Sequence, residues 1–337
     1  MTASAPKIKA VGLFSGGLDS ALAVKIILEQ GVAVVGYYFR TPFIGGGSRA
    51  ERLAERLGIE LVVDEAGEDY VEMLKAPRFG RGAAFNPCIN CHIFMLRRAG
   101  ALMLERGASF CFTGEVLGQR PMSQRRYHLK LIEKEAGLEG KLLRPLSAKL
   151  LPPTEAEEEG LVDRAALLGL EGRSRKTQLA LAASYGITGY SSPAGGCLLT
   201  DKNFGARLAD AFTHGEDRPA DIVLLKLGRH FRLPSGAKAV VGRNEGENEE
   251  LLRYLDGDAA AFEVEGVGSP VTLLRPARRE DRPRAAALTL RYSDARDRAE
   301  APTRVRTARG EAETITARAG DAADAETWRI SAGPEEK

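Results

Sequence analysis

The N-terminal part of the chain alternates short apolar runs with longer amphipathic stretches. The apolar runs are typical of buried strands and lie at 8–14, 32–39, 59–63 and 109–112. The stretches with helical spacing lie at 18–30, 49–57 and 94–105. This order predicts an α/β fold, a Rossmann-like parallel sheet with flanking helices. Each predicted strand ends in Gly, Ser, Thr or Asp, and ligands of such sheets bind outside the carboxyl ends of the strands.

The pattern changes after Pro152. Residues 154–187 predict an amphipathic helical segment with Thr154 as its N-cap, and 204–212 predict a further helix. The polar stretch 213–221 breaks the periodicity, so we place a boundary there. The predicted domains are 1–214, which includes the helical segment 152–190, and 215–337. Alternating residues at 262–274, 286–293, 303–310 and 313–320 predict antiparallel strands and a smaller α+β C-terminal domain.

Composition narrows the class of protein. A chain of 337 residues exceeds what one core usually organises, and a hydrophobic fraction of 44% excludes disorder of the whole chain. The balance of 48 Lys+Arg against 46 Asp+Glu requires any nucleic-acid partner to be held by local patches. Four cysteines are too few for a disulfide scaffold and indicate a reducing compartment. The sequence shows no signal peptide or bilayer-spanning run, so we expect a cytoplasmic protein without a membrane partner.

The segment SGGLDS, Ser15 to Ser20, follows the first predicted strand and opens the first predicted helix. Its two glycines let the backbone approach a phosphate, and the helix N-terminus offers N–H groups to an anion. Asp19 is placed to hold Mg²⁺ against such phosphates. The segment fits neither GxxxxGK[ST] nor GxGxxG. The alternative is a tight strand–helix turn that only requires small residues.

Three cysteines form the second candidate site. Cys88 and Cys91 form a C-x2-C pair ahead of the helix expected near Phe94, and Cys197 lies far away in sequence. Cys111 lies within an apolar strand and is interpreted as a packing residue. The pair alone is compatible with half a zinc site or a redox pair. Three thiolates suit a 4Fe-4S cluster with one open iron, and burial as small apolar residues is the structural alternative.

Four segments resemble known families. VGLFSGGLDSALAV, 11–24, resembles the PP-loop of the ATP pyrophosphatase superfamily, which has a fold of the HUP type. This resemblance implies that the loop cradles the pyrophosphate of ATP while a substrate oxygen attacks the α-phosphate. The residues that match the loop motif are Ser15, Gly16, Gly17, Asp19 and Ser20. TGEVLGQ, 113–119, resembles a segment of 4-thiouridine synthase, which implies that Thr113 and Gly114 contact ATP and that Gln119 lines the site.

NPCINC, 86–91, resembles the NPDxxC segment of bacterial tRNA 2-thiouridine synthases, with Cys91 at the matching cysteine and Cys197 as its distant partner. The chain departs from that family at Cys88, where the family has Asp. The pattern of C-x2-C plus a distant cysteine is closer to the cluster-bearing thiolases related to 4-thiouridine synthase. This resemblance favours a 4Fe-4S cluster on Cys88, Cys91 and Cys197. A persulfide relay between Cys91 and Cys197 is the alternative.

Basic residues supply candidate RNA contacts. The first cluster contains Arg120, Arg125, Arg126, Lys130 and Arg144, and the second contains Arg173, Arg175 and Lys176. Such groups suit phosphate backbones, although a solvated helix face is the alternative for each. Residues 228–274 resemble the RNA-binding domain of NFACT proteins through a VGRNxxxN segment with Gly242, Arg243, Asn244 and Asn248. Arg243 and Asn244 are therefore candidate RNA ligands, and capping of a helix is an equal alternative for Asn244.

These features predict a sulfurtransferase that thiolates tRNA uridine with ATP and Mg²⁺. The resemblance implies that ATP adenylates the uridine carbonyl oxygen, that sulfur replaces it, and that AMP and pyrophosphate are released. Asp19, Cys88, Cys91 and Cys197 are the predicted catalytic residues. The partners are tRNA and a sulfur donor, either a cysteine desulfurase, a persulfide carrier or inorganic sulfide. The alternatives are a PP-loop enzyme that acts on a small molecule and a non-catalytic RNA-binding protein that keeps an ATP loop.

Overall fold

The computed structural model describes residues 8–45, 47–190 and 196–333. The chain divides into two compact units, Met1–Gly82 with Asn86–Leu198 and Ala83–Phe85 with Leu199–Lys337. The boundary therefore lies before helix α8 (Lys202–Thr213) and not after it as the sequence predicts. The reason is packing within the second unit, where Phe85 contacts Phe212 edge to face with ring centroids 5.8 Å apart. No described helix has the length and apolar character needed to cross a membrane.

The first unit is built on a parallel sheet with the order β3-β2-β1-β4-β5. Its strands are β1 (Lys9–Leu13), β2 (Ala33–Arg40), β3 (Glu60–Glu65), β4 (Phe110–Thr113) and β5 (Leu142–Leu143). The predicted α/β fold and its first four strands are confirmed. Strand β5 has only two residues, which is too short to produce a recognisable apolar run.

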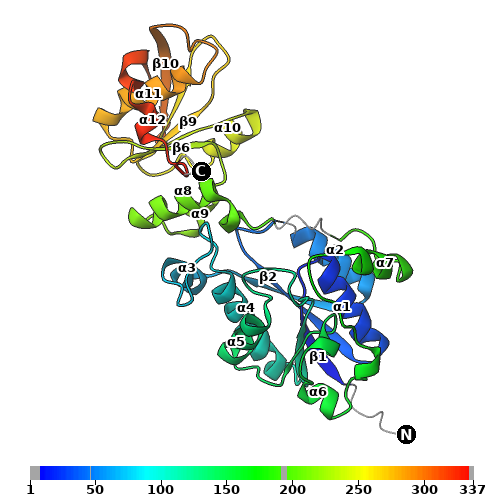
Figure 1. Cartoon of the computed structure of the whole chain (residues 1–337). Helices are drawn as coiled ribbons and strands as arrows, with labels where there is room; N and C mark the ends of the chain where they lie inside the picture. Colours follow the sequence, from blue (N-terminus) through cyan, green and yellow to red (C-terminus); the bar gives the residue numbers. More distant parts are fainter. Residues whose placement is uncertain (1–7, 46, 191–195, 334–337) are drawn as a thin grey trace. The chain divides into compact units, whose positions relative to one another are not determined.

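Helices cover both faces of this sheet, with α1, α2 and α7 on one side and α4 and α5 on the other (Figure 1). Their bounds are α1 (Leu18–Glu29), α2 (Gly47–Leu57), α3 (Glu68–Lys75), α4 (Cys88–Glu105), α5 (Arg126–Ala136), α6 (Glu155–Glu158) and α7 (Lys176–Ser184). The start of α4 was expected near Phe94 but lies at Cys88, so both cysteines of the C-x2-C pair belong to its first turn.

The segment 154–187 is not one long helix. It contains only α6, a short 3-10 turn at Arg164–Ala166 and α7, because glycines interrupt the helical pattern. Gly160 and Gly172 adopt positive φ angles of 70° and 83°, which end a helix rather than continue it. The predicted cap is confirmed: Thr154 and Glu157 form a capping box at the start of α6.

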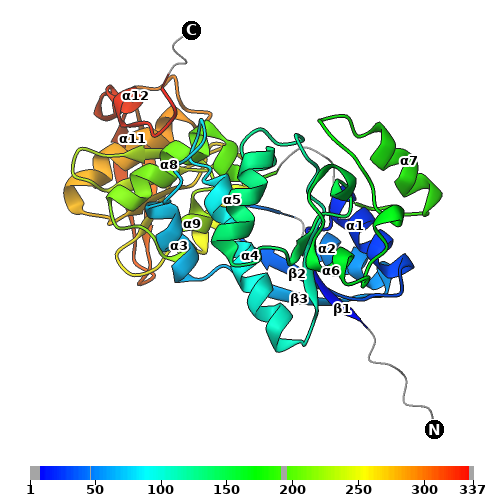
Figure 2. The same cartoon turned by 60° about the horizontal axis from the view of Figure 1, so that its bottom comes forward.

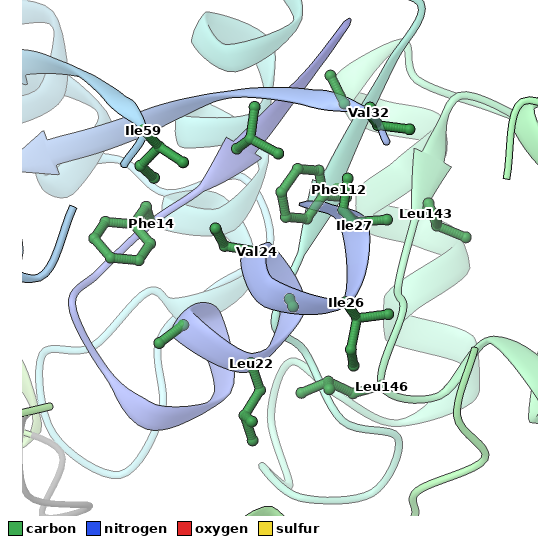
Figure 3. Close-up of a cluster of buried hydrophobic side chains, with 14 of the residues drawn as sticks. Phe14, Leu22, Val24, Ile26, Ile27, Val32, Ile59, Phe112, Leu143 and Leu146 are labelled. Atoms are coloured by element: carbon green, nitrogen blue, oxygen red, sulfur yellow. The ribbon is translucent and has the colours of Figure 1, made fainter. Parts of the chain in front are cut away.

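The core of the first unit lies between α1 and the sheet (Figure 3). Helix α1 is buried on nearly all sides, with Leu22 and Ile27 fully enclosed beside Phe112 of β4 and Phe14. A Cβ atom at Gly12 of β1 would lie 2.4 Å from Phe112 Cζ, so the aromatic ring occupies the space that a side chain would take. This dense packing holds the residues directly after β1 in place, and these residues are the first part of the candidate site.

The second unit contains an antiparallel sheet with the order β11-β10-β8-β9-β7-β6. Its strands are β6 (Arg229–Arg232), β7 (Lys238–Val241), β8 (Ala260–Val264), β9 (Thr272–Arg275), β10 (Glu300–Thr307) and β11 (Ala312–Arg318). Its helices after α8 are α9 (Pro219–Leu224), α10 (Glu245–Leu252), α11 (Arg282–Arg291) and α12 (Ala325–Trp328). Figure 2 shows helices α8, α9, α11 and α12 of this unit. The α+β prediction for this region is confirmed.

The strand expected at 286–293 is wrong, because most of these residues belong to α11. A proline near the start of this helix favours a helix start, and the alanine run after it has high helix propensity. Residues Ala285 to Leu290 are all buried, so this stretch has no exposed side and its continuous apolar run resembles that of a buried strand.

The stability of the second unit should depend on pH through His230 of β6. Burial lowers the pKa of this side chain well below its usual value, and the Lys238 and Arg207 charges act in the same direction. The unfolded chain takes up a proton here below about pH 6.5, whereas the native unit does not. The free energy of unfolding should therefore fall on acidification by about 1.4 kcal/mol per pH unit for this group.

Urea unfolding followed by the fluorescence of Trp328, the single tryptophan of the chain, measures this slope. The substitution His230→Gln should flatten it between about pH 6.5 and pH 5. The control, His214→Gln, changes an exposed histidine of the same unit and should leave the slope as in the wild type. An unchanged slope in His230→Gln would show that the native unit already carries the proton.

Candidate active site

The loop after β1 has the backbone geometry of an anion cradle. Gly16 has a φ angle of +70°, and a Cβ atom at this position would lie 2.7 Å from the Cα atom of Ala50. Only glycine satisfies both constraints. Gly17 is the N-cap of α1, and the Ser20 hydroxyl donates to its carbonyl oxygen at 2.9 Å and lies 3.3 Å from the Ser15 hydroxyl. The loop therefore presents the start of α1 with its dipole and two hydroxyl groups.

The carboxylate of Asp19 lies at the centre of this loop. Gln119 Nε2 donates to its Oδ2 atom at 3.2 Å, and Arg175 lies 3.6 Å from the same oxygen. Its Oδ1 atom is buried and has no hydrogen-bond partner among the described residues. Burial raises the pKa of Asp19, while Arg175 and Gln119 oppose that rise. An unpaired buried carboxylate oxygen is a suitable ligand for Mg²⁺, so the residues present fit this ion.

The turn after β4 touches the loop directly. Strands β1 and β4 are paired with Leu13 opposite Thr113, so both end at the same edge of the sheet. A Cβ atom at Gly114 would lie 2.5 Å from the carbonyl carbon of Asp19. The structure thus brings the predicted ATP residues of the two segments together, and Gly114 is required by this close approach.

The three predicted site cysteines lie in segments at this edge. Cys88 and Cys91 lie in the first turn of α4, and Cys197 pairs through its backbone with Ile44 in the segment after β2. All three are half-buried, whereas Cys111 of β4 is fully buried as predicted. Burial raises the pKa of Cys91 to about 12, and Cys197 and Cys88 add to the rise, so both lie within electrostatic reach of the Cys91 thiol. The neighbouring residues 191–195 of the segment SPAGGC lie outside the described residues.

Two buried side chains contact these sulfur atoms and were missed by the sequence reasoning. The hydroxyl of Tyr70, from α3, lies 3.3 Å from Cys91 Sγ. The amide Nδ2 of Asn86 donates to Cys88 Sγ at 3.3 Å. Asn86 opens the NPCINC segment two residues before Cys88, and this place in the segment is a signal that could have identified it.

Glu115 connects the two halves of the site. Its Oε1 atom lies 3.1 Å from Nδ1 of His92, the residue after Cys91, and its Oε2 atom accepts from Arg144 at 3.2 Å and from Thr113 at 3.1 Å. Burial alone would raise the pKa of Glu115, but His92 and Arg144 outweigh it and lower the pKa to about 2. Glu115 is therefore an anion at neutral pH that joins helix α4 to the turn after β4.

The basic residues of the first unit divide into two groups. Those that remain on the surface, as RNA contacts require, are Arg120, Arg125, Arg126, Lys130, Arg173 and Lys176. Arg144 is 4% exposed and paired with Glu115 and Glu133, so its assignment to a surface patch is wrong. Arg175 faces Asp19 instead of the surface, and its buried Nε atom has no hydrogen-bond partner among the described residues.

In the second unit the VGRN segment borders a depression of 690 Å³. Asn244 accepts a hydrogen bond from the backbone of Glu247 and caps α10, while Asn248 accepts from the backbone of Val271. Both asparagines thus have structural roles. Arg243 is exposed but forms an ion pair with Glu247.

Further arginines around the depression were missed by the sequence reasoning. Arg229 stacks on Tyr292, with its guanidinium carbon 4.7 Å from the ring centroid. The other basic residues of the lining are Arg291, Arg296 and Arg306, and its acidic residues are Glu245, Glu249, Glu263 and Asp294. The surface therefore combines positive charge with an aromatic ring and acidic neighbours.

Comparison with known proteins gives two independent similarities. Residues 228–329 match the family model described as the NFACT protein RNA binding domain. The chain is also 33% identical over 148 residues to a probable tRNA sulfurtransferase from Thermus thermophilus, which covers 41% of this chain and 34% of that protein. A probable tRNA sulfurtransferase from Methanosarcina mazei is 30% identical over 117 residues, covering 33% of this chain and 29% of that protein. The chain spans about a third of the length of these curated relatives.

Two solved structures align with part of the chain. One is a 4-thiouridine synthetase–RNA complex with bound ATP, with 28% identity, a TM-score of 0.35, and coverage of 42% of this chain and 37% of that chain. The other is a predicted subunit of a tRNA methyltransferase from Methanocaldococcus jannaschii, with 18% identity, a TM-score of 0.34, and coverage of 52% and 76%.

The stability of the first unit should depend on Glu115. The substitution Glu115→Gln removes one of the two carboxylate partners of the buried Arg144 and leaves Glu133 as the other, which should lower the free energy of unfolding by about 3 kcal/mol. Because the native pKa is about 2 against an ordinary value of 4.5, the wild-type contribution is present above pH 4.5 and is lost as the pH falls toward 2. Urea unfolding followed by circular dichroism, repeated across this pH range, measures both effects.

The control is Glu135→Gln, which removes the partner of the exposed Arg78 and should cost less than about 1 kcal/mol. Equal losses in the two variants would contradict a special role for Glu115.

Proposed function

We propose that this chain is an ATP-dependent tRNA uridine thiolase, with its chemistry in the first unit and an RNA-binding surface in the second. The observation that carries this proposal is the meeting of the SGGLDS loop and three cysteines at one edge of a parallel sheet. Similarity to probable tRNA sulfurtransferases and to an RNA-binding domain supports the choice of tRNA as substrate. A nucleotide loop alone would equally suit a small-molecule enzyme.

In this proposal the loop and the start of α1 bind the phosphates of ATP. Asp19 holds Mg²⁺ through its unpaired Oδ1 atom, and Thr113 with Gly114 borders the nucleotide. The uridine carbonyl oxygen attacks the α-phosphate, and pyrophosphate leaves. The resulting adenylate makes this oxygen a good leaving group, so sulfur replaces it at the carbon and AMP departs.

The cysteines supply the sulfur site. Among the described residues, no group of three or more His, Cys, Asp or Glu side chains is placed to hold a single metal ion. A 4Fe-4S cluster separates its ligands by its own iron and sulfide atoms, and three soft thiols suit such a cluster in chemistry. Cys88, Cys91 and Cys197 would hold it. When bound, the cluster would supply an open iron that presents sulfur for transfer.

Anaerobic assays of the purified protein test this function. With ATP, Mg²⁺, tRNA and sulfide, the wild type should form thiouridine, detected by mass spectrometry of tRNA nucleosides. Asp19→Asn should lose activity at least 100-fold because Mg²⁺ loses a ligand, and Cys91→Ala or Cys197→Ala should lose it because no sulfur is held. The control, Cys111→Ala, changes a buried cysteine outside the site and should stay active. Failure of the wild type, or activity in Cys91→Ala, would contradict the proposal.

We further propose that Arg175 binds ATP phosphate and not RNA. The loop has no lysine after its glycines, and the Arg175 guanidinium lies 3.6 Å from the Asp19 carboxylate. Once Mg²⁺ takes over the Asp19 carboxylate, the guanidinium is available for phosphate oxygens. Arg175→Gln should therefore weaken binding of Mg·ATP by about 10- to 100-fold, as expected for a lost charged hydrogen bond of about 1.5–3 kcal/mol.

Calorimetric titration measures this loss, with the exposed Arg173→Gln as the control. The control should bind Mg·ATP as the wild type does. If Arg175→Gln weakens only tRNA binding, Arg175 belongs to the RNA surface after all.

A further inference from the structure

The sulfur atoms of the C-x2-C pair each face one buried polar group. Tyr70 is 3% exposed and its hydroxyl lies 3.3 Å from Cys91 Sγ, while Asn86 is 8% exposed and its amide donates to Cys88 Sγ at 3.3 Å. The two groups come from different segments, α3 and the turn before α4. Each sulfur atom thus has its own polar neighbour.

The position of the Tyr70 hydroxyl is fixed by aromatic packing. Its ring lies edge to face against Phe39 of β2 and Phe94 of α4, with centroid distances of 5.1 and 5.3 Å, and Phe43 lies 6.2 Å away. Such packing orients the ring without contributing a polar group, so the hydroxyl remains directed at the sulfur. Around the Tyr70 ring, the Cys91 sulfur is therefore bordered by aromatic side chains and approached by one phenol hydroxyl.

We propose that Tyr70 and Asn86 are positioning residues that donate hydrogen bonds to negatively charged sulfur on Cys91 and Cys88. A cysteine sulfur that ligates iron or carries a persulfide has no proton on Sγ, so in the Tyr70–Cys91 pair only the phenol has a proton to donate. In an apolar pocket these two donors replace the water that would otherwise stabilise such charge. This inference rests on the proposed sulfur chemistry of the site, but it holds for either a cluster or a persulfide.

The donors should have a measurable effect on a bound cluster. Hydrogen bonds to cysteine sulfur favour the reduced state, which carries one more negative charge, and so raise the reduction potential. Tyr70→Phe removes only the hydroxyl and keeps the packed ring, and Asn86→Asp replaces the donor by an acceptor of the same shape. Tyr127→Phe is the matched control because Tyr127 is a surface side chain that is 72% exposed.

The experiment is anaerobic reconstitution of the full chain with iron and sulfide, followed by a redox titration monitored by electron paramagnetic resonance. We expect a lower potential in Tyr70→Phe and in Asn86→Asp than in the wild type and Tyr127→Phe, with equal iron content in all four proteins. Equal potentials in all four proteins would overturn the assignment while leaving the proposed cluster intact.

If the wild type binds no cluster, the cofactor part of the proposed function fails and the persulfide form is tested instead. The same proteins are treated with polysulfide, and persulfide at Cys91 is followed over time by mass spectrometry. Tyr70→Phe should lose it faster than the wild type and Tyr127→Phe. Equal rates of loss, or no persulfide in the wild type, would overturn the role of Tyr70.

Discussion

The buried carboxylate of Glu115 is the interaction on which the first unit's site depends. It contacts His92, accepts from Arg144 and is anchored to Thr113, so one anion connects the cysteine helix, the body of the unit and the nucleotide turn. A buried charge of this kind is tolerated only when its partners are present. The cost of burying it therefore fixes the placement of helix α4 relative to the turn after β4.

The parallel sheet explains why these parts meet at all. The nucleotide loop follows β1, the turn at Thr113 and Gly114 follows β4, and Cys197 pairs with the segment after β2. Because the strands are parallel, these three segments emerge at one edge, and α4 begins there with its cysteines. The proposed reaction requires an activated carbonyl and a sulfur atom to come close, and this topology brings the corresponding segments to one edge of the sheet.

The fold of the first unit could largely be predicted from sequence because strands buried on both faces produce continuous apolar runs. The sequence prediction was wrong for α11, because its buried stretch shows no contrast between an apolar and a polar face of a helix. It was also wrong for 154–187, where glycines end the helices that the spacing of apolar residues predicts. The nucleotide loop was recognisable because it is a contiguous motif. The positions of basic residues in the sequence predicted the RNA contacts less well, because a basic cluster does not show which side chains are directed into the fold. Arg144 and Arg175 are two that are. Tyr70 belongs to none of the motifs found in the sequence, and only the folded chain shows that its hydroxyl lies beside Cys91 Sγ.

The central claim is that tRNA itself is activated by ATP at this edge of the sheet, before sulfur is transferred. Isotope exchange between labelled pyrophosphate and ATP tests this claim most directly, because it reports adenylation alone. The account predicts exchange that requires tRNA and Asp19, needs no sulfur donor and persists in Cys91→Ala. Exchange that proceeds without tRNA, or that is absent with tRNA and Mg·ATP present, would contradict it.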